Sequence, residues 1–262
     1  AFAAGKHVLN EKPIAMSVAE VEKMIAARGD LVAASCSSRM HYTKCAEKAR
    51  ELIREGILGN VRVIRVNGIV EAGEAPTTPP VPWRYRTKEN AGGIMSNWGC
   101  YDLDYILGLF DWKLKPASIS AQTWTIAPEL ESRIAPDSDA ETHAAALVRF
   151  EGGIVMTMER GEHIGRSSRL VWEITGTKGS LHLSMVPDES MTIVHDSIDP
   201  EEGLVTKTVF EGSADWEDIH FGPIEDFARA VRGEKKPNTG YEEAMIIRRI
   251  TEGMYESSRT GQ

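Results

Sequence analysis

The chain has 262 residues, of which 42% are hydrophobic and 26% charged, a composition typical of a folded globular protein that argues against a disordered or fibrous one. Its 30 lysines and arginines against 39 aspartates and glutamates give a formal charge of −9, and the basic residues are scattered. Because no basic stripe is available to neutralise a phosphate backbone, we do not expect the protein to bind nucleic acid.

The cysteines and the apolar runs indicate where the protein works. Cys36, Cys45 and Cys100 are an odd number without metal-type spacing, so we expect reduced thiols, no structural zinc and a cytoplasmic location. No apolar run approaches the roughly 20 residues that cross a bilayer, and the first residues lack the pattern of a signal peptide. We therefore expect no membrane contact. The sequence does not begin with Met, so Ala1 need not be the natural start.

Residues 1–57 alternate between strand and helix signals. A short apolar run stops at Pro13, and Ser17 with Glu20 forms a capping box ahead of a helical repeat. The run 31–36 suits a strand buried on both faces. The predicted elements are a strand and its exit loop at 7–13, a helix at 17–28, a strand at 31–36, and a helix that carries Cys45, Ala49, Leu52 and Ile53 and ends near Gly56 and Gly59. This order is typical of a doubly wound parallel sheet, so residues 1–57 are assigned to a dinucleotide-binding domain.

Residues 58–262 follow a different pattern, with strands at hairpin spacing. Apolar residues alternate with polar ones, as at Ile154, Met156 and Met158. The predicted strands are 61–70, 117–125, 143–150, 154–161, 169–175, 180–184, 191–195 and 204–210. The predicted helices are about 93–109, 222–233 and 241–258, and a Pro-rich loop spans 76–82. We expect an α/β protein in which a partial Rossmann-type parallel sheet precedes an α+β domain with a large, mostly antiparallel open sheet.

Lys12 follows the first predicted strand, in the sequence Glu11-Lys12-Pro13. Ligands of an open parallel sheet bind beyond the carboxyl ends of its strands, so Lys12 is expected to point at a cleft. There it can donate to a substrate oxygen or a cofactor amide, and partial burial would lower its pKa. A solvated loop lysine is the alternative that position alone leaves open.

A second set of polar residues lies on the helix predicted at 93–109. Asn97, Tyr101 and Asp104 are spaced i, i+4 and i+7, so an amide, a phenol and a carboxylate share one face. Polar groups aligned on an otherwise apolar helix indicate a site. The alternative is that Tyr101 packs in the core with its hydroxyl hydrogen-bonded.

Further residues are weaker candidates, each with a plain structural alternative. Trp83 and Arg84 follow the Pro-rich loop, and they either contact a sugar-like substrate or anchor the loop. The stretch 37–41 leaves the second parallel strand and is expected to form a secondary wall of the same cleft. Three polar residues on or beside two strands are candidates for substrate contact but are not expected to bind a metal: His143, Glu159 and His163.

The segment that contains Lys12 and a series of later segments recur in the same order in one known family. They are Ala4–Pro13, Leu52–Gly59, Trp83-Arg84, Gly92-Gly93, Gly176–Leu181, Asp226–Pro237 and Ser257-Ser258. In these segments, and along nearly all of its length, the chain resembles the glucose–fructose oxidoreductase / inositol dehydrogenase / rhizopine-catabolism family of nicotinamide-dependent oxidoreductases.

The resemblance implies a Rossmann domain joined to an α/β domain, with the nicotinamide ring and the substrate meeting between them and the open sheet serving as an oligomer interface. The catalytic residues that it implies are Lys12, Asn97 and Tyr101. We expect cofactor contacts at Glu11, Lys12, Pro13 and Arg84. We expect substrate contacts at Trp83, Arg84, Asn97, Tyr101 and His163.

The chain departs from the family's usual helix, which carries Asp and then His four residues later. Asn97 and Tyr101 hold these places here. Tyrosine is similar to the glucose–fructose oxidoreductase and dihydrodiol dehydrogenase branches, where the phenol is the proton donor or acceptor. Asparagine removes a negative charge that would raise the pKa of Lys12, so Lys12 should deprotonate more easily. Asp104 matches a carboxylate common in the family, whereas Asp102 has no counterpart.

A second departure is the lack of a glycine-rich turn. The family begins with a strand and a Gly-x-Gly-x-x-Gly turn, and no such motif occurs in this sequence. At about 30 residues per βαβ unit, roughly 90 residues of the family's dinucleotide domain are not represented. Because Lys12 and Tyr101 are both present, we expect a fragment of an ordinary enzyme in preference to a degenerate homologue. The residue that selects NAD or NADP would lie in the part not represented.

Together, these features predict an NAD(P)-dependent dehydrogenase or reductase that moves a hydride between nicotinamide and a carbon of a sugar, polyol or cyclitol. Tyr101 would be the acid–base group, and Lys12 would tune it. The expected partners are a sugar-like small molecule and further copies of the chain, in a dimer or tetramer. Two alternatives are a non-catalytic oligomerisation or binding module and an enzyme that recycles NAD during elimination or glycoside cleavage.

Overall fold

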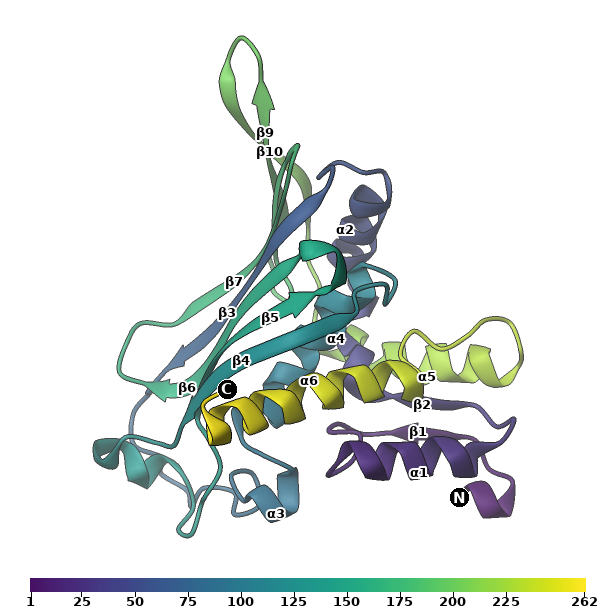
Figure 1. Cartoon of the computed structure of the whole chain (residues 1–262), viewed down its shortest axis with the longest axis vertical. Coiled ribbons are helices and arrows are strands. Elements are labelled where there is room, and N and C mark those ends of the chain that lie inside the picture. Colours follow the sequence, from purple (N-terminus) through teal and green to yellow (C-terminus); the bar gives the residue numbers. More distant parts are fainter.

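Two β-sheets organise the chain, and the computed structural model describes all of residues 1–262 (Figure 1). A two-stranded parallel sheet lies near the N-terminus, and a sheet of eight strands follows it. This mixed α/β architecture, with a small parallel sheet and a large, mostly antiparallel one, confirms the predicted fold class. None of the helices combines the length and apolarity needed to cross a bilayer.

The elements follow the predicted order. The strands are β1 (Val8–Asn10), β2 (Ala33–Ser35), β3 (Val61–Glu71), β4 (Pro116–Trp124), β5 (His143–Phe150), β6 (Val155–Ile164), β7 (Arg169–Gly176), β8 (Gly179–Leu183), β9 (Met191–Asp199) and β10 (Gly203–Gly212). The α-helices are α1 (Val18–Arg28), α2 (Lys44–Arg54), α3 (Thr87–Asn90), α4 (Cys100–Leu109), α5 (Trp216–Val231) and α6 (Tyr241–Thr260). Short 3₁₀ helices span Phe2–Ala4, Cys36–Tyr42, Pro128–Arg133 and Glu151–Gly153, and a π-helix at Met95–Gly99 runs into α4.

The N-terminal unit is built on β1 and β2, which pair in parallel with Leu9 opposite Ala34. Helix α1 begins where the Ser17 hydroxyl accepts a hydrogen bond from the Glu20 N–H at 3.2 Å, as the capping box predicted. Val21 of α1 packs with Tyr241 of α6 in a small hydrophobic cluster. The C-terminal helix therefore joins this unit, which the order of elements in the sequence did not indicate.

The large sheet has the strand order β10-β9-β8-β7-β3-β6-β5-β4, and all neighbours are antiparallel except β3 and β6. These two can run parallel because β4, β5 and α4 lie between them in the sequence and supply the crossover that parallel neighbours need. Ile64 of β3 lies opposite Met156 of β6, and both side chains are fully buried on one face of the sheet. The neighbouring Arg65 and Thr157 point to the other face and are exposed. The sheet thus has one buried face, as the alternation of residues predicted.

Figure 1 shows α2, α4 and α6 on the same side of the large sheet. Their apolar side chains share one hydrophobic core with the buried face of the strands. Every residue of α4 is buried, so this helix lies at the centre of the core. Polar side chains on α4 are therefore under strong pressure to find partners inside the protein.

The start of α5 differs from the prediction. The helix begins at Trp216 rather than near 222, because the Asp215 carboxylate caps it by accepting a hydrogen bond from the Asp218 N–H at 2.8 Å. Pro223 consequently lies inside the helix. Proline is usually confined to the first helical turn, which made a later start the more obvious interpretation.

A buried ion pair joins α4 to the large sheet. Asp102 accepts a hydrogen bond from the Trp172 indole N–H at 3.0 Å and lies 3.0 Å from Arg160 Nε of β6. The Arg160 guanidinium also stacks over the Trp98 ring, with 5.0 Å between Cζ and the ring centroid. Asp102, which the sequence left without a role, therefore fixes α4 against β6.

We expect the Arg160→Leu substitution to lower the free energy of unfolding by about 3–5 kcal/mol, because it leaves the Asp102 carboxylate buried without its counter-ion. Urea unfolding measures the change. The matched control is Arg249→Leu, which breaks the exposed pair with Glu22 and should cost no more than about 1 kcal/mol. Equal losses in the two variants would contradict a special role for the buried pair.

Candidate active site

Lys12 and Tyr101 meet at one place, although they come from different parts of the chain. Lys12 follows β1, and its ammonium donates to the backbone oxygen of Asn97 at 2.7 Å and to its side-chain oxygen at 2.6 Å. The same ammonium lies 5.0 Å from the centroid of the Tyr101 ring. The structure therefore brings together the three residues that the sequence marked as catalytic candidates.

The helix that carries Asn97 and Tyr101 begins at a tight contact with Glu141. The buried Glu141 carboxylate accepts hydrogen bonds from the backbone N–H groups of Gly93 at 2.8 Å and Met95 at 2.9 Å. These are the free N–H groups of a first helical turn, which a carboxylate satisfies well. A Cβ on Gly93 would lie 1.8 Å from the Glu141 backbone oxygen, so only glycine fits there.

A π-helical segment lies between this start and α4, at Met95–Gly99. Such wide turns are rare in proteins, and those that occur are often found at functional sites. The π-helix contains Asn97, and Tyr101 follows it at the start of α4. The sequence predicted one continuous helix from 93 to 109 and contained no signal for this change of pitch.

Tyr101 is only 5% exposed, and its hydroxyl accepts a hydrogen bond from Arg39 Nη1 at 2.7 Å. Arg39 Nη2 in turn donates to the Glu11 carboxylate at 2.5 Å. The Tyr101 ring packs edge-on against Trp98, with 5.5 Å between the ring centroids. Burial raises the pKa of the phenol above its usual value, and the Arg39 charge and hydrogen bond act in the opposite direction.

Asp104 holds the segment that carries Arg39 against α4. Its buried carboxylate accepts hydrogen bonds from the Ser37 hydroxyl at 2.5 Å, His41 Nε2 at 2.7 Å and the Thr239 hydroxyl at 2.9 Å. Arg50 donates to His41 Nδ1 at 2.9 Å, which places the imidazole proton on Nε2, facing Asp104. Ser37 and His41 flank Arg39 in the 3₁₀ helix Cys36–Tyr42.

The pKa of Lys12 is lowered from its usual value, first because the ammonium is buried and also because of the positive charges of Arg39 and Arg84. The sequence suggested the same direction, from partial burial and from the lack of a charge on residue 97. The structure puts burial first among the causes and adds the charges of Arg39 and Arg84. Burial thus lets Lys12 lose its proton more easily than a solvated lysine would.

The remaining predicted residues lie at different distances from this centre. Arg84 pairs with the buried Glu162 carboxylate at 2.8 Å. The charge of Arg84 lowers the pKa of Lys12, and the charge of Lys12 in turn lowers the pKa of Glu162 against the effect of burial. Trp83 is 49% exposed. His163 packs beside the Tyr85 ring, at 6.4 Å between ring centroids.

His143 and Glu159 are hydrogen-bonded to each other at 3.0 Å on the half-exposed face of the sheet. Glu159 also accepts from the Asn67 amide on that face. Because the buried face of β6 carries Arg160 and Glu162, His143 and Glu159 point away from Lys12. The structure therefore does not bring this pair to the candidate active site.

Sequence reasoning missed two residues of the site and underrated a third. Glu162 continues the inward alternation of Met156, Met158 and Arg160 along β6, a signal that selects it over His163. Trp98 lies beside Asn97 in the same segment but was read only as part of a helix. Arg39 was assigned to a secondary wall, and its bond to the Tyr101 hydroxyl had no signal in the sequence.

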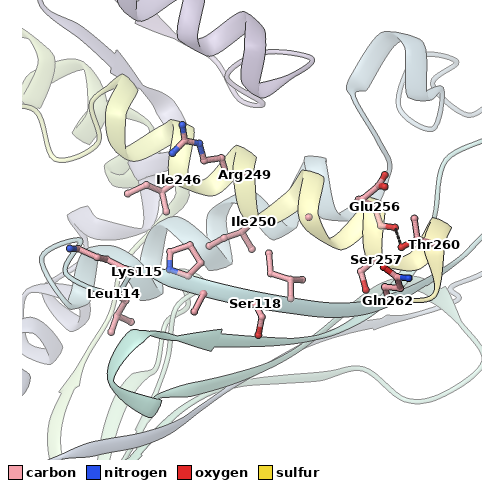
Figure 2. Close-up of a pocket in the computed structure, with 14 residues that line it drawn as sticks. Leu114, Lys115, Ser118, Ile246, Arg249, Ile250, Glu256, Ser257, Thr260 and Gln262 are labelled. Carbon is pink, nitrogen blue, oxygen red and sulfur yellow. Dashed lines mark hydrogen bonds between the residues drawn. The ribbon is translucent and has the colours of Figure 1, made fainter.

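The larger cavities lie elsewhere. A groove of about 680 Å³ runs between β4 and α6, with Ile246 toward one end, Ser257 toward the other and Ile250 between them (Figure 2). Two further cavities, of about 720 Å³ and 600 Å³, lie over the open face of the sheet and beside α5. None of the three is lined by Tyr101, so the size of a cavity does not identify the candidate site. The site is identified by the polar groups of Lys12, Asn97 and Tyr101, which meet at one place.

The fold and the site together describe an α/β protein with two sheets, in which a lysine and a tyrosine form a candidate acid–base pair. The model of the GFO/IDH/MocA C-terminal domain matches residues 46–182, and the chain belongs to the GFO/IDH/MocA family.

Relatives and solved structures agree with this assignment. Levoglucosan dehydrogenase of Pseudarthrobacter phenanthrenivorans is 24% identical over 230 residues, which cover 80% of this chain and 57% of the relative. Trans-1,2-dihydrobenzene-1,2-diol dehydrogenase of Xenopus laevis is 34% identical over 119 residues, 45% of this chain and 34% of the relative. A structure of levoglucosan dehydrogenase with NADH and levoglucosan has the same fold, with a TM-score of 0.81 at 20% identity, covering 100% of this chain and 74% of that one. The chain thus spans less than two thirds of the length of these two curated relatives.

We expect the Asn97→Asp substitution to raise the pKa of Lys12 by about 1 unit or more, because it places a negative charge within hydrogen-bond distance of the ammonium. The pH dependence of acetylation of Lys12, followed by mass spectrometry, measures the pKa. The exposed Lys23 in the same sample controls for the reagent. An unchanged pKa of Lys12 would show that residue 97 does not control this group.

Proposed function

We propose that the protein is an NAD(P)-dependent oxidoreductase that transfers a hydride between nicotinamide and a carbon bearing a hydroxyl or carbonyl group in a sugar, polyol or cyclitol. The observation that carries the proposal is the Lys12 ammonium lying over the Tyr101 ring, beside a phenol whose own proton has no acceptor in the chain. The names of the relatives, which are dehydrogenases of levoglucosan and of a dihydrodiol, support the substrate class.

The residues after β1 fit a nicotinamide cofactor, either NAD or NADP. Glu11, Lys12 and Pro13 lie at the carboxyl end of a parallel strand, where such ligands bind. Arg39 Nε is buried without a hydrogen-bond partner, which leaves one polar donor of the site to be satisfied. Glu11, Lys12, Pro13 and Arg84 would form the cofactor side of the site. When bound, the nicotinamide supplies or accepts the hydride.

Tyr101 would move the proton that accompanies the hydride. In reduction, the phenol donates its proton to the substrate oxygen; in oxidation, the phenolate takes the proton of the substrate hydroxyl. Lys12 lies close enough to stabilise the phenolate by its charge and to hold the substrate oxygen. Asn97 would fix the position of Lys12, because both of its oxygens accept from the ammonium.

The charges of the site favour an uncharged, hydroxyl-rich substrate over an acidic one. Arg39 is paired with Glu11 and Arg84 with Glu162, so neither arginine is free to bind a substrate carboxylate. Glu162 Oε1 is buried without a partner and is an acceptor for a substrate hydroxyl. Trp83, Arg84 and His163 remain proposed substrate contacts on the sheet side, together with Asn97 and Tyr101.

We expect the Tyr101→Phe substitution to lower kcat about 100-fold or more in the protein as it occurs in the cell, because it removes the acid–base group. The assay follows NADH or NADPH absorbance with a panel of sugars, polyols and cyclitols. The matched control is Tyr105→Phe, one turn further along α4, which removes a buried hydroxyl without a hydrogen-bond partner and should leave kcat unchanged.

The same assay separates the alternatives. Full activity in the Tyr101→Phe variant rejects Tyr101 as the acid–base group. Products of elimination or glycoside cleavage, identified by mass spectrometry without net change in NADH, would indicate an NAD-recycling lyase or glycosidase. No binding of cofactor or sugar by the wild-type protein would favour a non-catalytic oligomerisation or binding module.

We further propose a cytoplasmic homo-oligomer, a dimer or tetramer, that associates through the open face of the large sheet. The three cysteines are buried and free, which suits a reducing compartment. The open face carries a shallow cavity of about 720 Å³ lined by strands β3 to β7, and one such face on each copy can form a self-complementary interface. The division into a dinucleotide-binding part at 1–57 and a substrate part at 58–262 is proposed with it.

We expect Val171→Arg, on the open face, to shift the protein toward the monomer, because it places a charge where two copies would pack. Light scattering coupled to gel filtration measures the mass. Glu47→Arg on the exposed side of α2 is the control and should leave the mass unchanged. A monomeric wild-type protein would reject the proposed interface.

A further inference from the structure

We propose that Arg39 is a positioning residue that sets the direction and the acidity of the Tyr101 proton. Its guanidinium, held by Glu11 on one side, occupies the acceptor side of the phenol oxygen and leaves the phenolic hydrogen for the substrate. This inference rests on the function proposed above, in which Tyr101 is the acid–base group.

The geometry at the phenol oxygen carries the inference. Arg39 Nη1 donates to the Tyr101 hydroxyl at 2.7 Å, and no other group of the chain is hydrogen-bonded to that oxygen. A phenol that accepts one hydrogen bond still has its own O–H to donate. Because a guanidinium has no acceptor, the phenolic hydrogen cannot point at Arg39 and must turn to the opposite side. The contact thus orients the proton.

Arg39 is held firmly in this position. Its second nitrogen, Nη2, donates to Glu11 at 2.5 Å, so the planar guanidinium bridges a carboxylate and a phenol. The 3₁₀ helix that carries it is fixed to α4 by the bonds from Ser37 and His41 to Asp104. Tyr101 and Asp104 lie on the same helix, which keeps the distance from Arg39 to the phenol constant.

Four ionisable groups face Tyr101, and only one donates to its oxygen. Lys12 lies over the ring, Cys100 precedes Tyr101 on α4, and Glu11 is behind Arg39.

When the O–H bond of the phenol breaks and the proton passes to the substrate oxygen, the electron pair stays on the phenol oxygen. Nicotinamide is the source of the hydride, so no other reductant is needed. The charge that forms on the phenolate lies against the Arg39 guanidinium, which stabilises it.

The first experiment titrates the phenol and needs no activity. Tyr101→3,5-difluorotyrosine gives residue 101 a phenol that ionises at lower pH than tyrosine, and ultraviolet absorbance reports its ionisation. We expect Arg39→Gln to raise the pKa of this phenol by about 1 unit or more, the effect of losing a hydrogen bond from a charged donor. Arg39→Lys keeps the charge but loses the planar guanidinium that can donate to two partners at once, so it should raise the phenol pKa less.

The control is Arg28→Gln, which breaks an arginine–glutamate pair of 2.6 Å between α1 and α6, away from Tyr101. It should leave the phenol pKa unchanged. A phenol pKa in Arg39→Gln equal to that in Arg28→Gln, in proteins with unchanged circular dichroism, would overturn the proposal. If Arg39→Gln does not fold, the comparison of Arg39→Lys with the wild type decides in the same way.

The second experiment uses the pH profile of sugar oxidation. This direction needs the phenolate, so in the proteins that carry 3,5-difluorotyrosine at residue 101 activity rises with pH through the phenol pKa, and Arg39→Gln should move that rise to higher pH by the same amount as the titration. At neutral pH, kcat should fall about tenfold or more. A fall in kcat without a moved pH profile would mean that Arg39 has only a structural role. Loss of the proposed function would appear differently, as full activity in Tyr101→Phe.

Discussion

The buried carboxylate of Asp104 is the contact on which the arrangement of the site depends. Two segments that are distant from α4 in sequence converge on it: the 3₁₀ helix Cys36–Tyr42 through Ser37 and His41, and the residues before α6 through Thr239. A carboxylate inside a hydrophobic core is tolerable only when its oxygens are hydrogen-bonded, so the segments are held where their donors reach it. The consequence is a fixed register between the small parallel sheet and α4.

From this register the site follows. Asn97, Tyr101 and Asp104 present an amide, a phenol and a carboxylate along one side of the helical segment. Asn97 meets Lys12, Tyr101 meets Arg39, and Asp104 meets the residues on either side of Arg39. The site therefore lies at the contact between the N-terminal unit and the helical segment that carries Asn97 and Tyr101. The pKa of the partly buried Lys12 amine is lowered and that of the buried Tyr101 phenol is raised, because both groups are withdrawn from water at the same contact.

Much of the fold was predictable because its signals are local. The capping box at Ser17, the alternation along β6 and the glycine turns each act within a few residues, and these elements were placed correctly. The parallel pairing of β3 with β6, the π-helix at Met95–Gly99 and the position of α6 depend on contacts between distant residues, and the sequence pattern contained no trace of them.

The same distinction applies to the site. Lys12 and Tyr101 were identified from a strand end, a helical face and the resemblance to a family, all of which can be read in one dimension. Arg39 could not be identified in this way, because its contact with Tyr101 depends on where the hydrogen bonds to Asp104 hold the 3₁₀ helix that carries it. Glu162 is intermediate: the period of two along β6 points it inward, but only the structure shows that Arg84 meets it there.

The contact between β4 and α6 limits how copies of this chain can associate. Strand β4 is the last strand of the sheet, and such a border normally offers unpaired amides to any extended peptide. Here the hydroxyls of Ser257 and Ser258 accept from the amides of Ala121 and Thr123, at 2.9 and 3.0 Å. Over this stretch the C-terminal helix occupies the border, so a strand of a second copy cannot pair with β4 there.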